Sequence, residues 1–358
     1  MAVMHSRRFL FSLCALAAFA GLATSALAQE PELYVLGVHP HGIVVFDGTR
    51  NEIVNVMQTR GRAPKELVPS PDGKFLYITS EGRAELEVIN LETHAVDKVL
   101  HLAPPGYRLT IFGAVLNHKG DRLYVHVKPV RELIDRYQVD PPQVWSVDVA
   151  TGKTSKIAEV PQGVVALVLT ADERQLIAWG RDIYYIDISQ GRITGTFPLM
   201  NPLNPKEGAL NTLALFVQFE RSGIFSIPYY TKDPITNKDL MGLVDLDVNS
   251  GKVETVELGD PVPLYSSVVS PDRTRAYAVM NQLIAVDLEQ KRILKTVDLE
   301  RTRYVANISR DGKRVFVSGA APYIHVYDAD TLKLIKTVDL PGDPGVTGFR
   351  ALPPSAAR

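Results

Sequence analysis

The stretch Ala306–Leu340, ANISRDGKRVFVSGAAPYIHVYDADTLKLIKTVDL, decides the fold. It predicts four short strands, at 306–309, 314–318, 323–328 and 334–340. Polar and apolar residues alternate in the second and third of these, as in half-buried strands. Asp311-Gly312 is a turn pair, because glycine accepts a positive φ. A lone sheet of this kind cannot bury both faces, so it needs neighbours.

The chain repeats this unit. Clear copies run over 67–102 and 267–299, with the turn phrases SPDGK and SPDRT, and weaker copies over 114–160, 166–199 and 214–258. The segment 33–57 is a copy without its first strand. A polar residue ends the third strand of each copy, at Asp47, Asn90, Asp148, Asp187, Asp247, Asp287 and Asp328.

The spacing of these residues identifies the architecture. Their separations are 43, 58, 39, 60, 40 and 41 residues. A period near 40 with four strands per unit is typical of a β-propeller, whereas a solenoid would show helices or a shorter period. We therefore predict an all-β fold, a seven-bladed β-propeller of four-stranded antiparallel blades. An irregular β-sandwich with chance similarity between its parts is the alternative.

The first 28 residues have the pattern of a secretory signal peptide. Arg7 and Arg8 precede an apolar run, 9–22, and Ala26-Leu27-Ala28 offers small residues for cleavage. The run is too short for a stable membrane span. The arginine pair also fits a twin-arginine signal, so Sec and Tat export both stay open. Residues 29–358 are then a single exported propeller domain, and the expected location is the periplasm.

Removing this leader changes the composition. The only cysteine, Cys14, leaves with it, which excludes disulfides, c-type haem attachment and cysteine metal sites on the mature chain. The remaining 37 basic and 40 acidic residues give a formal charge of −3. No basic patch indicates nucleic acid as a partner.

The two ends of the chain predict how the ring closes. The first copy begins directly with its apolar strand, 33–38, and lacks an inner strand. The segment 346–352, VTGFRAL, follows the last copy and can supply that strand. Sharing one blade between both termini removes an open sheet edge.

Two copies are long, and both gain residues between their second and third strands. The insertions are Lys128–Pro142 and Pro228–Met241. Connections from a fourth strand to the next first strand share that end of a propeller, and three of these also look long, at 103–113, 201–212 and 259–266. Because loops on a rigid scaffold often carry binding, this end is the expected functional face.

No catalytic signature stands out. The chain has no Gly-x-Ser-x-Gly elbow, no His-Glu-x-x-His and no phosphate-binding glycine loop. His39 and His41 have the spacing of two metal ligands on an extended segment, but a turn is the simpler interpretation and we expect no metal site. His126 and His325 lie within predicted strands and are expected to be satisfied there. We therefore expect no catalytic residue on this chain.

Several phrases resemble the β-subunit of quinohaemoprotein amine dehydrogenase, a propeller related in architecture to the heavy chains of methylamine and aromatic amine dehydrogenases. They are the segment 112–114, the insertion words KPVREL (128–133) and YQV (137–139), IPYYT (227–231) and RYVANIS (303–309). The two insertions carry most weight, because the repeat does not dictate their wording.

The resemblance implies a function. Such enzymes are periplasmic heterotrimers that oxidise primary amines to aldehyde and ammonia. The large subunit is a cytochrome carrying two c-type haems, and the small subunit carries cysteine tryptophylquinone and the catalytic carboxylate. The propeller would hold the small subunit, help to wall the amine pocket at their interface and bind no cofactor itself.

The residues expected at this partner and substrate face follow from the insertions and from the phrases above. Tyr229 and Tyr230 are expected to offer contact area, Arg131 to pair with a carboxylate, and the prolines to limit the entropy lost on docking. The full set is Phe112, Pro129, Val130, Arg131, Tyr229, Tyr230, Thr231, Lys232, Tyr304 and Asn307.

Two other functions stay open. One is a generic secreted propeller of the YVTN type that binds a protein or surface ligand without a redox partner. The other is a propeller hydrolase with a central calcium, which needs six to eight oxygen ligands. Only scattered amides such as Asn117, Asn211 and Asn307 are available, so this function is ranked last.

Overall fold

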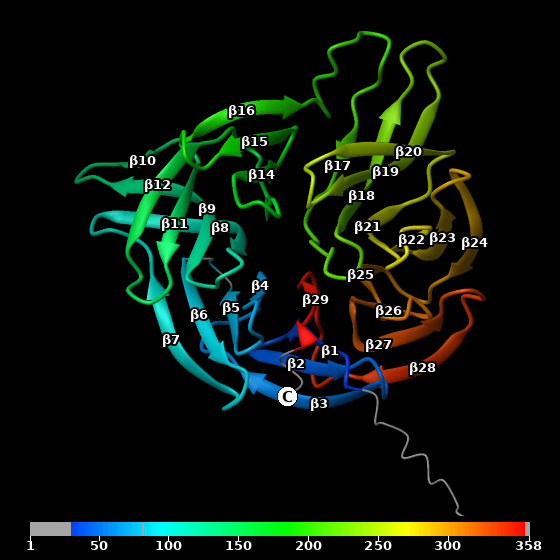
Figure 1. Ribbon diagram of the computed structural model, residues 1–358, viewed down its shortest axis with the longest axis horizontal. Helices are drawn as coiled ribbons and strands as arrows, with labels where there is room; N and C mark the ends of the chain where they lie inside the picture. The colour runs from blue at the N-terminus through cyan, green and yellow to red at the C-terminus, as the bar shows by residue number, and fades with distance from the viewer. Residues whose placement is uncertain (1–29, 81, 83, 355–358) are drawn as a thin grey trace, which may run out of the picture.

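The computed structural model describes residues 30–80, 82 and 84–354. The predicted signal peptide lies outside these residues. The described chain folds into seven antiparallel sheets arranged as a ring (Figure 1). No α-helix occurs among the described residues, so no helix in that part of the chain has the length and hydropathy needed to cross a membrane. The predicted seven-bladed propeller is confirmed.

Blade one joins the two ends of the chain, as predicted. It contains, from the axis outward, β29 (Phe349–Ala351), β1 (Leu33–Val38), β2 (Gly42–Asp47) and β3 (Glu52–Gln58). β29 pairs antiparallel with β1 through Tyr34↔Ala351 and Leu36↔Phe349. Phe349 is fully buried and packs edge-on to Tyr34, with ring centroids 5.6 Å apart. The last strand thus supplies the inner strand that the first copy lacks.

The other six blades follow in chain order. Blade two has β4 (Leu67–Pro69), β5 (Phe75–Thr79), β6 (Glu85–Asn90) and β7 (Ala95–His101). Blade three has β8 (Tyr107–Leu116), β9 (Arg122–Glu132), β10 (Tyr137–Val139), β11 (Gln143–Asp148) and β12 (Thr154–Glu159). Blade four has β13 (Ala166–Leu169), β14 (Gln175–Trp179), β15 (Ile183–Asp187) and β16 (Arg192–Phe197).

Blade five has β17 (Asn211–Thr212), β18 (Ile224–Lys232), β19 (Asp239–Asp247) and β20 (Val253–Gly259). Blade six has β21 (Leu264–Val269), β22 (Arg275–Met280), β23 (Gln282–Asp287) and β24 (Arg292–Asp298). Blade seven has β25 (Arg303–Ile308), β26 (Arg314–Gly319), β27 (Ala321–Asp328) and β28 (Leu334–Asp339).

The periodic polar residue has the same task in every blade. It is the last residue of the third strand, and its Oδ1 accepts a hydrogen bond from a backbone N–H two or three residues later. This Asx turn closes the hairpin to the outer strand. The seven copies inferred from these residues are therefore the seven blades.

Large side chains fill the space between neighbouring blades. Tyr77, Tyr124, Tyr277 and Phe316, each on the second strand of its blade, are at most 6% exposed. Trp145 and Trp179 are also buried in inter-blade clusters. Full burial of one such side chain contributes roughly 1.5–3 kcal/mol, so these contacts hold the blades together.

Blade five departs from the repeat near the axis. The copy at 214–258 predicts an inner strand beginning near Ala214, but only Asn211 and Thr212 pair with β18. The following segment, 213–223, leaves the sheet. Phe216 is buried in the cluster formed by blades one and seven, where it stacks on Tyr304 with ring centroids 6.4 Å apart. The segment therefore crosses the axis to the other side of the ring.

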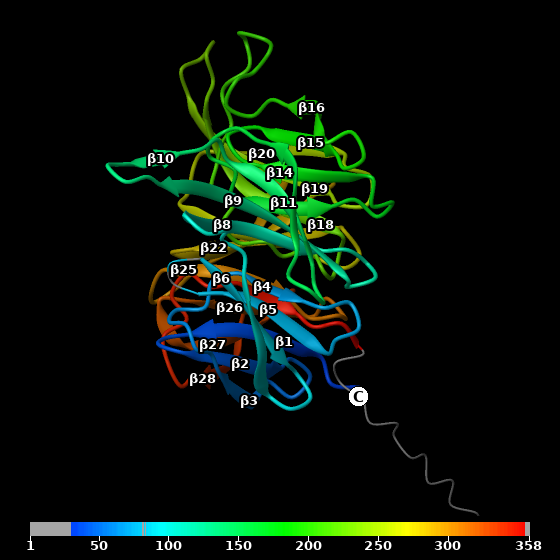
Figure 2. The ribbon, with the colours of Figure 1, turned by 90° about the vertical axis from the view of Figure 1, so that its left-hand side faces the viewer.

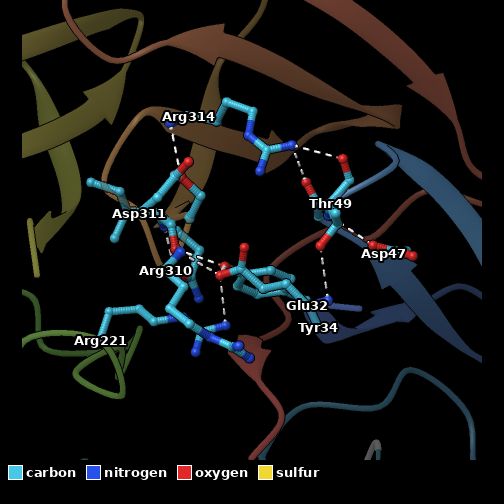
Figure 3. Close-up of polar contacts among 12 residues, drawn as sticks. Glu32, Tyr34, Asp47, Thr49, Arg221, Arg310, Asp311 and Arg314 are labelled. Carbon is cyan, nitrogen blue, oxygen red and sulfur yellow. Dashed lines mark hydrogen bonds and ion pairs between the residues drawn. The ribbon is translucent and has the colours of Figure 1, made fainter. Parts of the chain in front are cut away.

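Two ion pairs fasten this crossing segment to the beginning and end of the chain. Glu220 pairs with Arg350 of β29, and Arg221 Nη2 lies 2.9 Å from Oε1 of the buried Glu32. Figure 3 shows Arg221 and the backbone of Arg310 converging on Glu32, beside Tyr34. Tyr34 Oη lies 2.6 Å from that carboxyl, and burial raises the pKa of Tyr34 well above its usual value although Arg221 opposes this. We call residues Glu32, Glu220, Arg221 and Arg350 the clasp.

The two ends of the ring differ. Because strands alternate in direction, all connections from second to third strands share one end with those linking successive blades; we call it the insertion end. Seen from the side, β10 projects from this end (Figure 2). One expectation is wrong: residues 107–113 are not a loop but the first part of β8, because the lengthened β9 offers them a partner up to Tyr107↔Arg131.

Candidate functional site

The first insertion is a hairpin stiffened by charged pairs. β10 pairs with the end of β9, from Val139↔Val130 to Tyr137↔Glu132. Arg131 contacts both carboxylate oxygens of Asp140, at 2.8 to 3.1 Å. Arg108 of β8 pairs with Glu132, and its guanidinium carbon lies 5.1 Å from the centre of the Tyr137 ring. Contacts among β8, β9 and the segment that contains β10 and Asp140 therefore fix the conformation of this hairpin.

The tip of this hairpin presents apolar side chains to solvent. Ile134 is fully exposed, Val139 is 69% exposed and Tyr137 is 61% exposed. β10 pairs only with β9, so its other edge has no partner among the described strands. Exposed apolar groups on a stiff hairpin are typical of a surface that a partner protein covers.

The second insertion extends β18 and β19, which pair as far as Lys232↔Asp239. The Asp233 carboxylate accepts hydrogen bonds from the N–H groups of Ile235 and Thr236, at 2.7 and 2.9 Å. These bonds, first that from Thr236, hold the pKa of Asp233 below its usual value. Ile235, at the tip, is 72% exposed.

The connection 198–210, between blades four and five, is the third projecting segment (Figure 1). The buried Asp182 carboxylate accepts the N–H groups of Leu199 and Met200, at 2.7 and 3.0 Å. Gly208 passes so close to β18 that a Cβ would lie 2.2 Å from Thr231 Oγ1. Leu203 on this connection is 89% exposed. This connection and the second insertion thus form one continuous surface.

Exposed large hydrophobic side chains are unevenly distributed over the described residues. Five lie on outer strands: Val54, Val56, Leu294, Leu334 and Ile335. The other nine lie at the insertion end or along the axis: Leu133, Ile134, Tyr137, Val139, Leu203, Leu213, Leu215, Ile235 and Val346. No such residue lies on a turn of the opposite end, so the insertion end is the apolar face of the ring.

The structure corrects the roles expected for several predicted site residues. Tyr229 is 3% exposed and packs in the core with Trp179 and Phe225, so its ring offers no contact area to a partner. Pro129 is buried as well. Asn307 is 1% exposed because its amide donates to the Phe349 carbonyl of β29 at 2.8 Å.

The other predicted residues remain at least partly accessible. Tyr230 is half-buried, and its hydroxyl lies 3.0 Å from the Val262 carbonyl, which ties blade five to blade six. Arg131 is occupied by Asp140, as described above. The remaining five are Phe112, Val130, Thr231 and Tyr304, which are half-buried, and Lys232, which is exposed.

The structure does not gather this set into one pocket. The two insertions stand on blades three and five, with blade four between them. Phe112 instead lines a cavity of about 50 Å³ at the axis, together with Leu215, Val217 and Arg350. That volume holds no more than a water molecule or two. The accessible apolar residues of the two insertions lie at their tips. In the sequence they appear only as short apolar interruptions of the polar stretches ELIDR (132–136) and DPITN (233–237).

Two buried polar side chains lie near this face. Arg303 is fully buried, its guanidinium carbon lies 4.4 Å from the centre of the Tyr323 ring, and its nitrogens have no hydrogen-bond partner among the described residues. His126 is fully buried within its sheet beside the Phe112 backbone, and neither of its ring nitrogens makes a hydrogen bond of normal geometry among the described residues. Burial, with Lys128 adding to it, lowers the pKa of His126 to about 4, so the ring is neutral at pH 7.

His39 and His41 form the turn between β1 and β2, at the insertion end. His41 Nδ1 lies 3.0 Å from the Gly61 carbonyl oxygen, and His39 is exposed. Over the described part of the chain, no three His, Cys, Asp or Glu residues are grouped as a metal site requires. The pair is thus part of a turn.

Comparison with known proteins places the fold. No family model and no curated protein matches the chain. Among solved structures, it is similar to a chain of hydrazine synthase from Kuenenia stuttgartiensis, with a TM-score of 0.56 and 12% identity over 85% of this chain and 90% of that one.

Two further structures are similar to a comparable degree. Dihydro-heme d1 dehydrogenase NirN, in complex with DHE, has a TM-score of 0.55 and 16% identity over 88% of this chain and 74% of that one. A functionally unknown protein from Desulfotomaculum acetoxidans DSM 771 has a TM-score of 0.59 and 14% identity over 90% and 99%. At such identities these likenesses establish the β-propeller fold alone.

Proposed function

We propose that the chain is the cofactor-free propeller subunit of a periplasmic amine dehydrogenase complex, and that its insertion end holds a small quinone-bearing subunit. The distribution of exposed apolar side chains supports the partner-holding part of this proposal, and the wording of the two insertions supports the amine dehydrogenase part. A ring whose projecting tips are apolar and whose axis is filled is suited to holding a protein rather than to processing a small molecule. One of the similar structures carries the name of a dehydrogenase, which agrees with a place in such an assembly.

The partner surface consists of the apolar tips rather than the buried tyrosine. Ile134, Tyr137 and Val139 stand on a hairpin already ordered by Arg131 and Asp140, so docking costs little additional chain entropy. Ile235 and Leu203 stand on the second and third projecting segments. A primary amine would be oxidised by the partner, with the propeller forming part of the pocket wall.

Isolation of the complex tests the function. The tagged full-length chain is purified from its own cells grown on a primary amine, and the eluate is stained for covalent haem and for protein-bound quinone. We expect a dihaem cytochrome and a small quinone-positive subunit to co-elute, and the eluate to reduce a dye when a primary amine is added. Co-elution with neither subunit would overturn the proposal.

The same experiment distinguishes the second candidate, a protein-binding propeller without redox partners. The apolar insertion end favours that function equally. A stoichiometric partner that stains for neither haem nor quinone would establish it in place of the dehydrogenase.

A matched pair of variants tests the face. The triple change Ile134→Ser, Tyr137→Ser and Val139→Thr removes the apolar tip, whereas Val54→Thr, Val56→Thr and Ile335→Ser removes three exposed apolar groups from the outer strands. Each interface hot spot typically contributes about 2 kcal/mol or more. We expect the tip variant to lose at least 30-fold in affinity for the small subunit and the outer-strand variant to bind normally. The reverse pattern would assign the partner to another surface.

A further inference from the structure

One position of the repeat faces the next blade in every sheet. In each blade, the periodic polar residue that makes the Asx turn ends the third strand. The position in question lies on the second strand and pairs with the residue two places before that polar residue. Six blades place a large side chain there: Val35, Tyr77, Tyr124, Ile177, Tyr277 and Phe316. Blade five has Ser226, which is buried and accepts a hydrogen bond from Ser267 of blade six at 2.8 Å.

The cross-strand partner of this position is also exceptional in blade five. The other blades have Val45, Val88, Ser146, Tyr185, Ala285 and Val326. Blade five has Asp245, the single acid at this position in the seven blades. Where the other six blades have a larger apolar or aromatic side chain on the second strand, blade five has the Ser226 hydroxyl, with the Asp245 carboxyl opposite it.

A cleft opens where the large side chain is missing. It lies between blades five and six at the end of the ring opposite the insertions, and its volume is about 740 Å³. Asp245 lines it together with the apolar side chains of Ile224, Val256 and Val269. Turns of both blades form its rim. The cleft therefore has the Asp245 carboxyl and a few apolar side chains on its walls, and its remaining lining is mostly charged and polar.

Among the described residues, no cationic side chain acts on the Asp245 carboxyl. Although the residue as a whole is half-buried, its Oδ1 is shielded from solvent and has no hydrogen-bond partner of normal geometry in that part of the chain. Burial raises the pKa of Asp245 to about 6, with the Ser226 hydroxyl opposing this rise and Glu254 adding to it. At neutral pH the group is thus a shielded carboxylate, which costs free energy unless a positive charge approaches.

Three of the four cations on the rim are paired with other groups. Arg273 contacts Asp247 and the Ser222 carbonyl, both at 2.8 Å. Lys252 contacts Glu254 and Arg275 contacts Asp330, each at 2.5 Å. The fourth, Lys291, is exposed on the turn of blade six. Within the described part of the chain, no cation acts on the inner carboxylate, so a cationic ligand would be its first charged partner.

We propose that this cleft binds a small organic cation, an ammonium group carried on a short apolar chain. The ammonium group pairs with Asp245, and the chain lies against Ile224, Val256 and Val269. A divalent metal ion is a poor occupant, because Ca²⁺ takes six to eight oxygen ligands. Among the described residues, no three His, Cys, Asp or Glu side chains lie close enough together to hold a metal ion. The site lies at the other end of the ring from the insertions and does not depend on the proposed function.

Titration of the full-length chain with n-butylammonium, followed by ligand-observed NMR, tests the proposal. We expect saturable binding to one site, and binding at least tenfold weaker for 1-butanol and for butyrate. Asp245→Asn should weaken n-butylammonium binding at least tenfold. Asp298→Asn, an exposed change outside the cleft on β24, should leave it unchanged.

A second variant guards against a folding defect in the first. Ser226→Tyr introduces the residue that blades two, three and six carry at this position, so the ring should keep its fold while the cleft is filled. We expect a normal thermal transition and no n-butylammonium binding. The proposal is overturned if the wild-type chain shows no saturable binding, if 1-butanol binds equally well, or if either cleft variant binds n-butylammonium as the wild type does.

Discussion

Asp182 holds the start of the third projecting segment through the N–H groups of Leu199 and Met200 and the amide of Asn201. Burial alone would raise its pKa, but these bonds outweigh burial and hold the pKa of Asp182 below the usual value. Asp182→Asn should therefore lower the free energy of unfolding at pH 7 by about 1–2 kcal/mol. Urea unfolding measures this difference.

The same group predicts a pH dependence with a definite sign. Because the folded pKa of Asp182 is lowered, its stabilisation is fully present above the unfolded pKa, about 4, and is lost as pH falls through the folded value. The wild type and Asp182→Asn should thus converge below pH 4. The control is Asp298→Asn, whose exposed carboxylate accepts one bond from Gln282. A constant difference at all pH values would contradict the assignment.

At the scale of single residues, the sequence predicted what the repeat dictates. The turn acids and the inter-blade aromatics recur with the period, so their places could be read directly. The burial of Tyr229 could not, because Tyr229 and Tyr230 point to opposite faces of an extended strand and nothing local says which face is covered. Ser226 and Asp245 were readable as departures from the aligned repeats.

Among the structural elements, two were mispredicted for the same physical reason. β8 begins at Tyr107 only because the lengthened β9, the next strand along the chain, is long enough to pair with it. The segment 213–223 begins with the apolar run LALFV, which would suit a buried strand, yet Phe216 packs in the core of blades one and seven. In both cases a tertiary partner outweighs the local pattern.

The clasp should contribute measurably to stability. The side chains of Arg350 and Glu220 are 13% and 19% exposed, so removing one partner leaves a largely buried charge. We expect Arg350→Met and Glu220→Gln each to cost about 2 kcal/mol or more. The double variant should cost less than the sum of the two, as measured by a double-mutant cycle in urea. Strict additivity would show that the pair is not coupled.

For the molecule as a whole, the ring depends on its last strand. A chain that stops after Gly342 lacks β29, so β1 keeps an unpaired inner edge and the buried Phe349 is absent. Removing a large core aromatic side chain alone typically costs about 3–5 kcal/mol. We expect little soluble monomer by size-exclusion chromatography with light scattering. A stop after Pro354 retains β29 and should behave as the full chain; equal monomer yields from both would contradict a closing role.

The proposed division of labour also predicts the behaviour of the isolated subunit. The full-length propeller, purified alone, should not reduce a dye when a primary amine is added and should show no visible absorbance, because Cys14 is the only thiol in the sequence and lies in the predicted leader. Adding the quinone-bearing and haem-bearing subunits should restore turnover. Amine oxidation by the propeller alone would refute the proposed role.

Because blade one contains strands from both ends of the described chain, it cannot be completed until both strands have been synthesised. β1 begins at Leu33 and β29 at Phe349, 316 residues later. At about 5–20 residues per second, a ribosome delivers the two strands roughly 15–60 s apart. Six blades can form in sequence during that interval, while the first waits for its inner strand. The ring can therefore close only after β29, the last strand that the structure describes, has been synthesised.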